Sequence, residues 1–133
     1  KNEPITLADV QAAGEVRDRD IVILWEGRDH LYRTKESHSR PYLAEDAARW
    51  LALEKRVKLL GTDSSGFEVR GVGTHPNHHL FFKSGVDIPV IECLSNLDKI
   101  PNQRFFFLGL PLPVKGLDAS PIRAVALEIE GLS

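Results

Sequence analysis

The sequence predicts an α/β domain, and three segments carry that prediction. Ile21–Trp25 is a continuous apolar run rich in β-branched residues, which is typical of a strand buried on both faces. Leu43–Arg56 has apolar residues at helical spacing, and Val57–Gly61 follows it directly as a second apolar strand. A strand, a helix and another strand in this order form a βαβ pattern, in which the strands pair in parallel.

Length and composition fit a single globular domain over residues 1–133. Apolar residues make up 42% of the 133 residues and charged residues 27%, both ordinary values for a folded domain. With 17 lysines and arginines against 19 acidic residues, the net charge of -2 argues against a nucleic-acid surface. The longest apolar runs are far shorter than the roughly 20 residues of a membrane helix, so we expect no membrane partner and a cytoplasmic location.

Cys93 is the one cysteine of the sequence, which excludes an internal disulfide and a cysteine-rich zinc site. Its neighbour Glu92 is negatively charged and is expected to raise the pKa of the thiol. Cys93 is therefore a poor candidate for a nucleophile.

At the amino-terminal end, a short helix is predicted over Leu7–Ala13. Thr6 is in place to cap it, Asp9 stands three residues further on, and Gly14 is the expected stop. The polar stretch Gly27–Tyr42 is long for a loop in a compact domain. Such a loop either covers a site or is a solvated surface segment.

The remaining elements are short and separated by turns. Glycines predict turns over Thr62–Thr74, and Pro76 suits the first turn of a helix over about Asn77–Lys83, with Gly85 as its stop. Further strands are predicted at Pro89–Glu92, Arg104–Leu108 and Arg123–Ile129, and the aromatic residues expected in the core are Trp25, Trp50 and Phe105–Phe107.

Five polar residues are candidates for chemistry. His75, His78 and His79 cluster at the start of a predicted helix, and imidazole is the commonest protein ligand for zinc and similar metals. Glu92 ends a strand, where it either reaches solvent or is buried and needs a cation. Asp63 follows a strand, where α/β folds place ligands and where aspartate also caps turns.

The order of these segments resembles the metal-dependent hydrolases of the cyclase family, which includes kynurenine formamidases and isatin hydrolases. Asp20–Leu24 resembles the family's Gly-Asp-Ile-Val-Leu strand, and Leu43–Leu51 resembles its helix ending in Ala-x-Trp-Leu. The most specific matches are His79–Leu97, which resembles a His-x-x-Leu-Leu … Ile-Glu-x-Leu-x-Asn-Leu block, and Leu110–Ala126, which resembles the closing Leu-Pro-Leu … Gly-x-Pro-x-Arg-Ala-Ile-Ala segment.

The resemblance implies a swivelling β/β/α fold around a mixed, barrel-like sheet, in a homo-oligomer. It implies metal ligation by His79 and Glu92, with His78 as a rival ligand because of the spacing to Glu92. Glu92 would also act in catalysis by passing a proton to the leaving amine. The implied metal is Zn²⁺ or Mn²⁺, and the implied substrate is a small amide or cyclic amide.

The family's His-x-Gly-Thr-His-x-Asp-x-Pro-x-His motif, which supplies most metal ligands, is absent from this sequence. The resemblance therefore covers the carboxyl-terminal portion of a family member, and a hydrolase would need an amino-terminal fragment or second chain for the remaining ligands. The alternatives are a non-catalytic structural or binding relative of the same fold, and an unrelated α/β domain with surface histidines.

Overall fold

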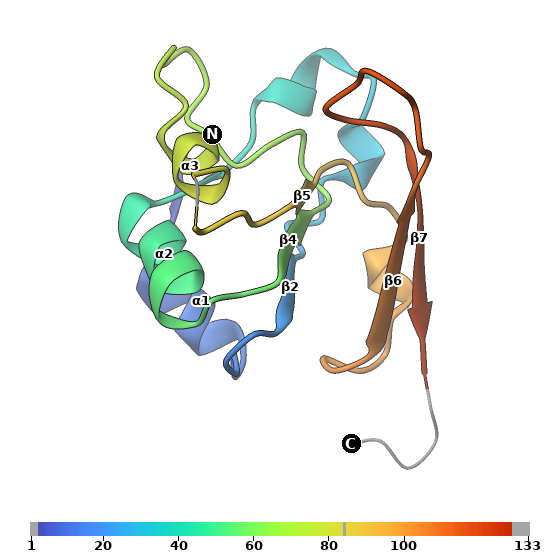
Figure 1. Ribbon diagram of the computed structural model, residues 1–133, viewed down its shortest axis with the longest axis horizontal. Coiled ribbons are helices and arrows are strands. Elements are labelled where there is room, and N and C mark those ends of the chain that lie inside the picture. The colour runs from blue at the N-terminus through green and yellow to red at the C-terminus, as the bar shows by residue number, and fades with distance from the viewer. Residues whose placement is uncertain (1–2, 84, 129–133) are drawn as a thin grey trace. The chain divides into compact units, whose positions relative to one another are not determined.

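The computed structural model describes residues 3–83 and 85–128, and three α-helices and seven strands are found within them (Figure 1). In chain order the elements are β1 (Pro4–Ile5), α1 (Leu7–Ala13), β2 (Ile21–Leu24), β3 (Tyr42–Leu43), α2 (Glu45–Arg49), β4 (Leu59–Thr62), α3 (Pro76–Phe81), β5 (Val90–Ile91), β6 (Phe106–Pro111) and β7 (Ile122–Leu127). A π-helical segment, Trp50–Glu54, continues α2, and short 3₁₀ turns lie at Asp29–Leu31, Lys35–His38 and Leu97–Lys99.

The chain divides into two compact units, Lys1–Leu97 and Asp98–Ser133. In the first unit β2, β4 and β5 form a parallel sheet with β4 in the centre, and β1 pairs with β3 in parallel. In the second unit β6 and β7 form an antiparallel pair. Over residues 3–83 and 85–128 the strands make separate small sheets, so the expected barrel-like sheet is not found as a closed barrel. A barrel needs unbroken pairing around its circumference, and these sheets have free edges.

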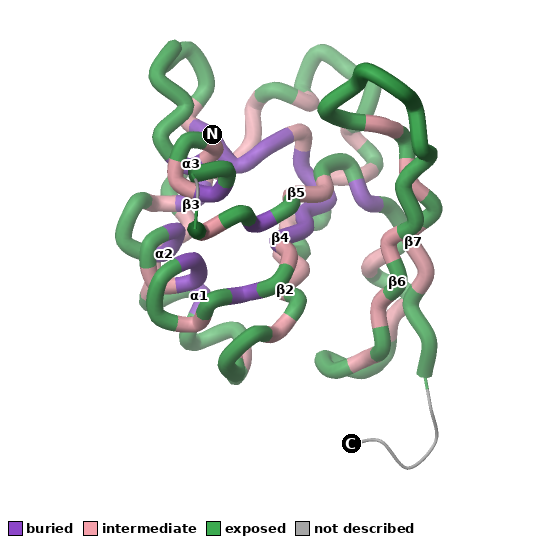
Figure 2. The backbone as a smooth tube through the Cα atoms, in the orientation of Figure 1, coloured by how far each residue is buried: buried purple, intermediate pink, exposed green. Residues whose placement is uncertain are grey.

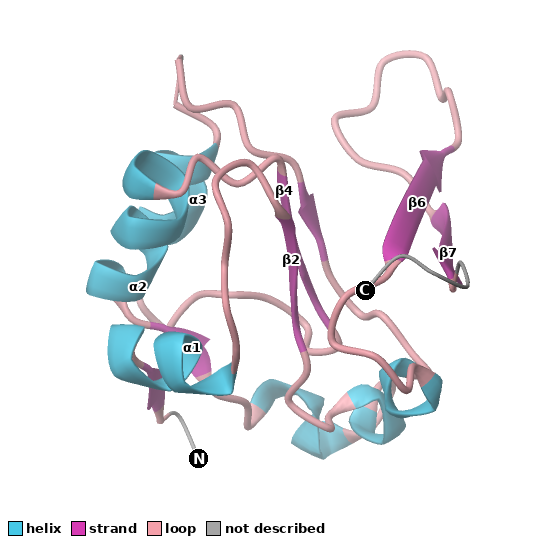
Figure 3. Cartoon of the chain, turned by 90° about the horizontal axis from the view of Figure 1, so that it is seen from below, coloured by secondary structure: helices cyan, strands magenta, loops and turns pink. Residues whose placement is uncertain are grey.

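The βαβ prediction is confirmed by the parallel register of β2 and β4, which runs from Ile21 opposite Leu59 to Leu24 opposite Thr62. The helices α1, α2 and α3 lie along one face of this sheet (Figures 1 and 3). The predicted first helix is also confirmed, with its capping box between Thr6 and Asp9. The Thr6 hydroxyl oxygen accepts from the backbone N–H of Asp9, and the Asp9 carboxylate accepts from that of Thr6.

The core lies between the helices and the central strand, as the buried positions of α2 and β4 in Figure 2 show. Ala47, Ala48 and Leu51 are fully buried at the end of α2 and in the π-helical segment that follows. Leu60 of β4 and Phe81 of α3 complete the centre of this cluster. The small side chains of Ala47 and Ala48 let the helix approach its neighbours closely.

Two expectations about burial are wrong. The run Ile21–Trp25 was expected to be buried on both faces, yet Ile21 is 39% exposed and Trp25 63% exposed. The reason is that β2 is an edge strand and the α-helices cover one face of its sheet. The aromatic run Phe105–Phe107 was expected in the core, but side chains alternate across a strand and Phe106 is 53% exposed. Trp50 is partly buried against the core, as expected.

Within residues 3–83 and 85–128, no helix has both the length and the apolar character that crossing a membrane requires.

Replacing Leu51 by alanine should lower the free energy of unfolding by about 2–5 kcal/mol, because the side chain is fully buried and its removal leaves a cavity. Leu53 is the matched control, since it lies in the same π-helical segment but is 44% exposed. Leu53→Ala should change the stability by no more than about 0.5 kcal/mol. Urea unfolding of both variants measures the difference, and equal losses would show that this segment does not anchor the core.

Candidate active site

An open pocket lies where the start of α3, the end of β5 and the turn-rich segment before α3 come together. Its volume is about 830 Å³. Histidine, carboxylate and guanidinium groups dominate its wall, which is formed by Arg40, Ser65, Gly66, Glu68, Val69, Arg70, Gly71, His75, His78, His79, Phe82, Lys83 and Glu92. The pocket therefore collects most of the residues that the sequence marked as candidates, although they come from segments far apart in the chain.

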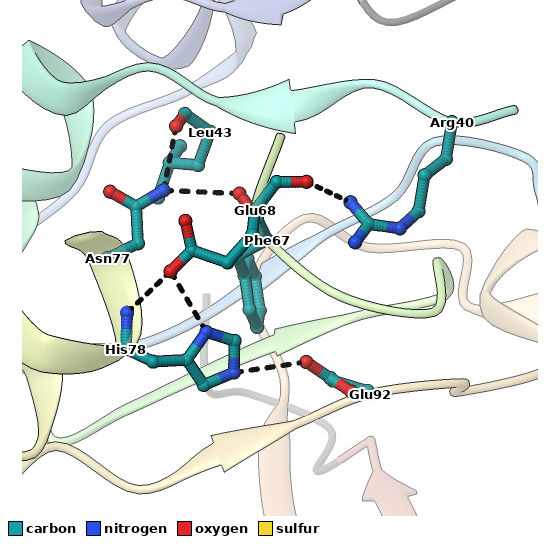
Figure 4. A network of polar contacts seen from close by, with 7 residues as sticks. All are labelled: Arg40, Leu43, Phe67, Glu68, Asn77, His78 and Glu92. Atoms are coloured by element: carbon teal, nitrogen blue, oxygen red, sulfur yellow. Dashed lines mark hydrogen bonds and ion pairs between the residues drawn. The ribbon is translucent and has the colours of Figure 1, made fainter. Parts of the chain in front are cut away.

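Glu68 holds His78 in place at the first turn of α3 (Figure 4). One carboxylate oxygen, Oε1, accepts from the backbone N–H of His78 at 2.7 Å and lies 3.0 Å from the ring nitrogen Nδ1. The first N–H groups of a helix have no partner inside the helix, and a carboxylate suits both that need and the helix dipole. Glu68 is thus a helix cap and an orienting group for the imidazole ring together.

On the other side of the ring, Nε2 of His78 faces Glu92, which follows β5. The distance from Nε2 to the Glu92 oxygen Oε1 is 3.4 Å. The hydrogen bond to Glu92 raises the pKa of His78, and Glu68 adds to that rise, while burial of the ring opposes it. His78 thus stands between two carboxylates, and in the metal-free protein both stabilise its protonated form.

Two neighbouring residues anchor this arrangement in the core. Asn77 is buried, and its side-chain amide donates to the carbonyl oxygens of Leu43 at 2.8 Å and Phe67 at 3.1 Å. Phe67 is also buried and packs edge to face on Phe81 of α3. Each anchor stands immediately before a site residue in the chain, because Phe67 precedes Glu68 and Asn77 precedes His78.

Arg40 reaches the pocket from the long polar segment Gly27–Tyr42. Its Nη1 donates to the carbonyl oxygens of Glu68 at 2.8 Å and Pro41 at 3.2 Å. The guanidinium is half-buried, and burial lowers its pKa although the nearby carboxylates of Glu92, Glu26 and Glu68 oppose that effect. The sequence left open whether this segment covers a site or is only solvated, and its last arginine does form part of the pocket wall.

Asp63 proves to be a turn-forming residue. Its carboxylate is buried and accepts from the backbone N–H groups of Glu26 at 2.8 Å and Arg28 at 2.6 Å, which ties the segment after β2 to the end of β4. Beside it, the hydroxyls of Thr62 and Ser64 donate to the carboxylate of Glu26. Burial raises the pKa of the Glu26 carboxyl.

The other candidates have a less central place. His79 is exposed on the pocket wall, and His75 precedes α3 with a left-handed backbone. The pKa of Cys93 is raised, as predicted, but burial of the thiol is the larger cause and Glu92 the smaller. Glu68 was missed, because in the sequence it is one acidic residue in a glycine-rich stretch and no spacing links it to His78.

A complete metal site would need more ligands than this pocket holds. Among residues 3–83 and 85–128, no group of three or more histidine, cysteine, aspartate or glutamate side chains is placed to hold a metal ion. The pair His78 and Glu92 nevertheless fits two positions of such a site. Two ligands about 2.1 Å from a tetrahedral Zn²⁺ are roughly 3.4 Å apart, and their facing atoms are separated by 3.4 Å. Glu68 on Nδ1 supplies the outer hydrogen bond that metal-binding histidines almost always make.

Comparison with known proteins decides the family. The family model "Putative cyclase" matches residues 1–69, just over half of the chain. The chain belongs to the cyclase family. This excludes the unrelated α/β domain that the sequence left as an alternative.

Curated relatives of this cyclase-family chain include two bacterial kynurenine formamidases. The protein from Sphingopyxis alaskensis is 36% identical over 73 residues, which are 55% of this chain and 34% of that protein. The protein from Bacillus cereus strain ATCC 10987 is 28% identical over 133 residues, covering 92% of this chain and 61% of the relative. The chain thus spans about a third to three-fifths of the length of these relatives.

Two solved structures resemble the fold closely. One is described as a potential metal-dependent hydrolase with cyclase activity, with a TM-score of 0.71 and 32% identity over 95% of this chain and 59% of the other. Isatin hydrolase A from Ralstonia solanacearum gives a TM-score of 0.81, covering 95% of this chain and 53% of its own, and at 22% identity it shows the fold alone.

In the metal-free protein, Glu92→Gln should lower the pKa of His78, because a neutral amide oxygen accepts a weaker hydrogen bond from the ring than the carboxylate, whose hydrogen bond raises this pKa most, and because the negative charge is lost as well. NMR titration of the His78 ring measures the change. Since folding raises the pKa, the stabilising contribution of the charged ring is fully present below the ordinary value of 6.5 and is lost as the pH rises through the folded pKa. Asp98→Asn, a surface charge change in the other compact unit, is the control. An unchanged His78 titration in Glu92→Gln would contradict the pairing.

Proposed function

We propose that this chain supplies the carboxyl-terminal portion of a metal-dependent hydrolase that acts on a small amide or cyclic amide. Membership of the cyclase family supports the reaction class. The observation that carries the proposal to particular residues is the placement of His78 between Glu68 and Glu92 in an open pocket. A histidine oriented by a buried carboxylate, with its other nitrogen facing a second carboxylate, is half of a metal site.

In this proposal His78 and Glu92 are ligands, and His79 is not. Neighbouring residues of an α-helix point about 100° apart, so only one of the two histidines can face Glu92. Nε2 of His78 does so at 3.4 Å, whereas His79 is exposed on the pocket wall. Glu68 accepts a hydrogen bond from Nδ1–H of His78, and in the neutral ring this leaves the lone pair on Nε2 free for a metal.

A bound Zn²⁺ or Mn²⁺ would lower the pKa of a water molecule and polarise the substrate carbonyl. The chain's own residues prepare the pocket for that chemistry. Glu92 faces His78 through Oε1, and its second oxygen, Oε2, would take a proton from the attacking water and pass it to the nitrogen of the leaving amine. Arg40 contributes a positive charge to the pocket wall near this carboxylate.

The remaining ligands come from the amino-terminal portion of the family domain, on this protein or on a second chain. A catalytic metal needs about three protein ligands and an open position, and His78 and Glu92 supply two. We call this chain together with that portion the assembly. We further propose that the assembly is a cytoplasmic homo-oligomer.

A non-catalytic relative that keeps the cyclase fold is the second candidate. The observation in its favour is that no group of three or more potential ligands is placed to hold a metal ion within the part of the chain that the structure describes. Metal analysis of the purified assembly separates the two candidates, because a non-catalytic relative would contain no stoichiometric Zn²⁺ or Mn²⁺.

In the assembly, His78→Ala and Glu92→Ala should abolish stoichiometric metal content. Each should also reduce the kcat for hydrolysis of an N-formyl aromatic amine by about 100-fold or more, because the metal that activates the water is lost, and Glu92→Ala also removes a proton transfer that contributes about 10²–10⁴. His79→Ala is the matched control, with metal content retained and kcat within about threefold of the parent protein. The measurements are elemental analysis and a formate-release assay. A large loss in His79→Ala with little effect of His78→Ala would overturn the ligand assignment.

A further inference from the structure

The half-buried guanidinium of Arg40, near Glu92, has so far been considered only for its charge. Arg40 lies on the pocket wall, and its Nη1 is engaged by two backbone carbonyls, those of Glu68 and Pro41. Within residues 3–83 and 85–128, no carboxylate forms an ion pair with it at 4 Å or less. Two carbonyl contacts on one nitrogen fix the plane of the guanidinium, because the group is rigid and flat.

Nη2 of Arg40 and Oε1 of Glu92 lie on either side of a small gap above the backbone of Gly66. A Cβ atom built on Gly66 would lie 2.8 Å from Nη2 of Arg40 and 3.1 Å from Oε1 of Glu92. The backbone of Gly66 has a φ of +139°, which L-residues with a side chain rarely adopt. Glycine at this position therefore serves two needs, the backbone conformation and the space for the two side chains.

Arg40 thus bonds to the backbone of Glu68 and lies across a gap from Glu92, the two acidic residues that flank His78. Arg40 holds the main chain of Glu68 through the carbonyl oxygen, while Nη2 stands across the Gly66 gap from the oxygen of Glu92 that faces His78. A displacement of the guanidinium would move the Glu68 backbone on one side of the ring and weaken the electrostatic attraction to the Glu92 carboxylate on the other. Both sides of the imidazole thus depend on one rigid group.

We propose that Arg40 is a positioning residue which, across the gap at Gly66, sets the place of the Glu92 carboxylate opposite His78. This proposal rests on the function proposed above for His78 and Glu92. Arg40 acts through Glu92 and Glu68 and does not itself bind the metal or the substrate. Its geometric role and its charge have opposite consequences for metal binding, and this opposition makes the proposal testable.

Charge alone would make Arg40 unfavourable for a metal cation, so its removal would tighten metal binding. If Arg40 instead positions Glu92, its removal should weaken metal binding. Arg40→Met should weaken Mn²⁺ binding to the assembly by about 10- to 100-fold, the usual effect of losing an outer contact of a metal site. Arg40→Lys keeps the charge but loses the rigid fork, and it should weaken binding as well. Gly66→Ala changes no charge and should act in the same direction, because its methyl group fills the gap.

The experiment measures free Mn²⁺ by electron paramagnetic resonance, with melting temperatures to identify variants that fail to fold. Arg70→Met is the matched control, since Arg70 is an exposed cation on the same pocket wall, and its Mn²⁺ affinity should stay within about threefold. Tighter binding in Arg40→Met with unchanged binding in Arg40→Lys would overturn the proposal in favour of a charge effect. Unchanged affinity in both folded variants would overturn it as well.

A second readout separates this proposal from the proposed function. In the metal-free protein, the ¹⁵N resonance of His78 Nε2 reports on the contact with Glu92 without any metal. Arg40→Met and Arg40→Lys should both shift it towards the value of free imidazole, and Arg70→Met should not. If the parent protein binds no metal but these shifts occur, the proposed function fails and the positioning role stands. If metal binds and neither the affinity nor the resonance responds to Arg40, the positioning role fails alone.

Discussion

The buried carboxylate of Glu68 is the contact on which the rest of the site depends. Burying a carboxylate costs free energy unless strong donors surround it. Here one oxygen of Glu68 accepts hydrogen bonds from both the backbone N–H and the ring Nδ1 of His78. The same interaction therefore starts α3 and orients an imidazole. With Nδ1 committed to Glu68, the other nitrogen is directed to Glu92, and the pair acquires the spacing of two ligands of one metal.

Core packing restricts the positions of Glu68 and His78, because each of them follows a buried neighbour. Phe67 fills the core one residue before Glu68, and Asn77 binds two backbone carbonyls one residue before His78. Interiors are close-packed, so such anchors allow little movement. The pocket is open to solvent, but its chemically important wall is a direct extension of the hydrophobic core.

Local rules explain what the sequence could predict. The capping box at Thr6 and the parallel pairing of β2 with β4 follow from neighbouring residues and from the βαβ pattern. Contacts between residues far apart in the sequence could not be predicted from the sequence. Glu68 meets His78 only because the turn-rich segment folds back. The exposure of Trp25 could not be predicted, because nothing in its apolar run reveals that β2 is an edge strand. The resemblance named Glu92, but only the helix geometry distinguishes His78 from its neighbour.

Anomalous X-ray diffraction at the zinc absorption edge, from crystals of the assembly grown with Zn²⁺, tests the central claim most directly. The account predicts an anomalous peak about 2.1 Å from Nε2 of His78 and at a similar distance from a Glu92 oxygen, with Glu68 still bonded to Nδ1. A peak coordinated by His79, or a metal out of contact with Glu92, would contradict it.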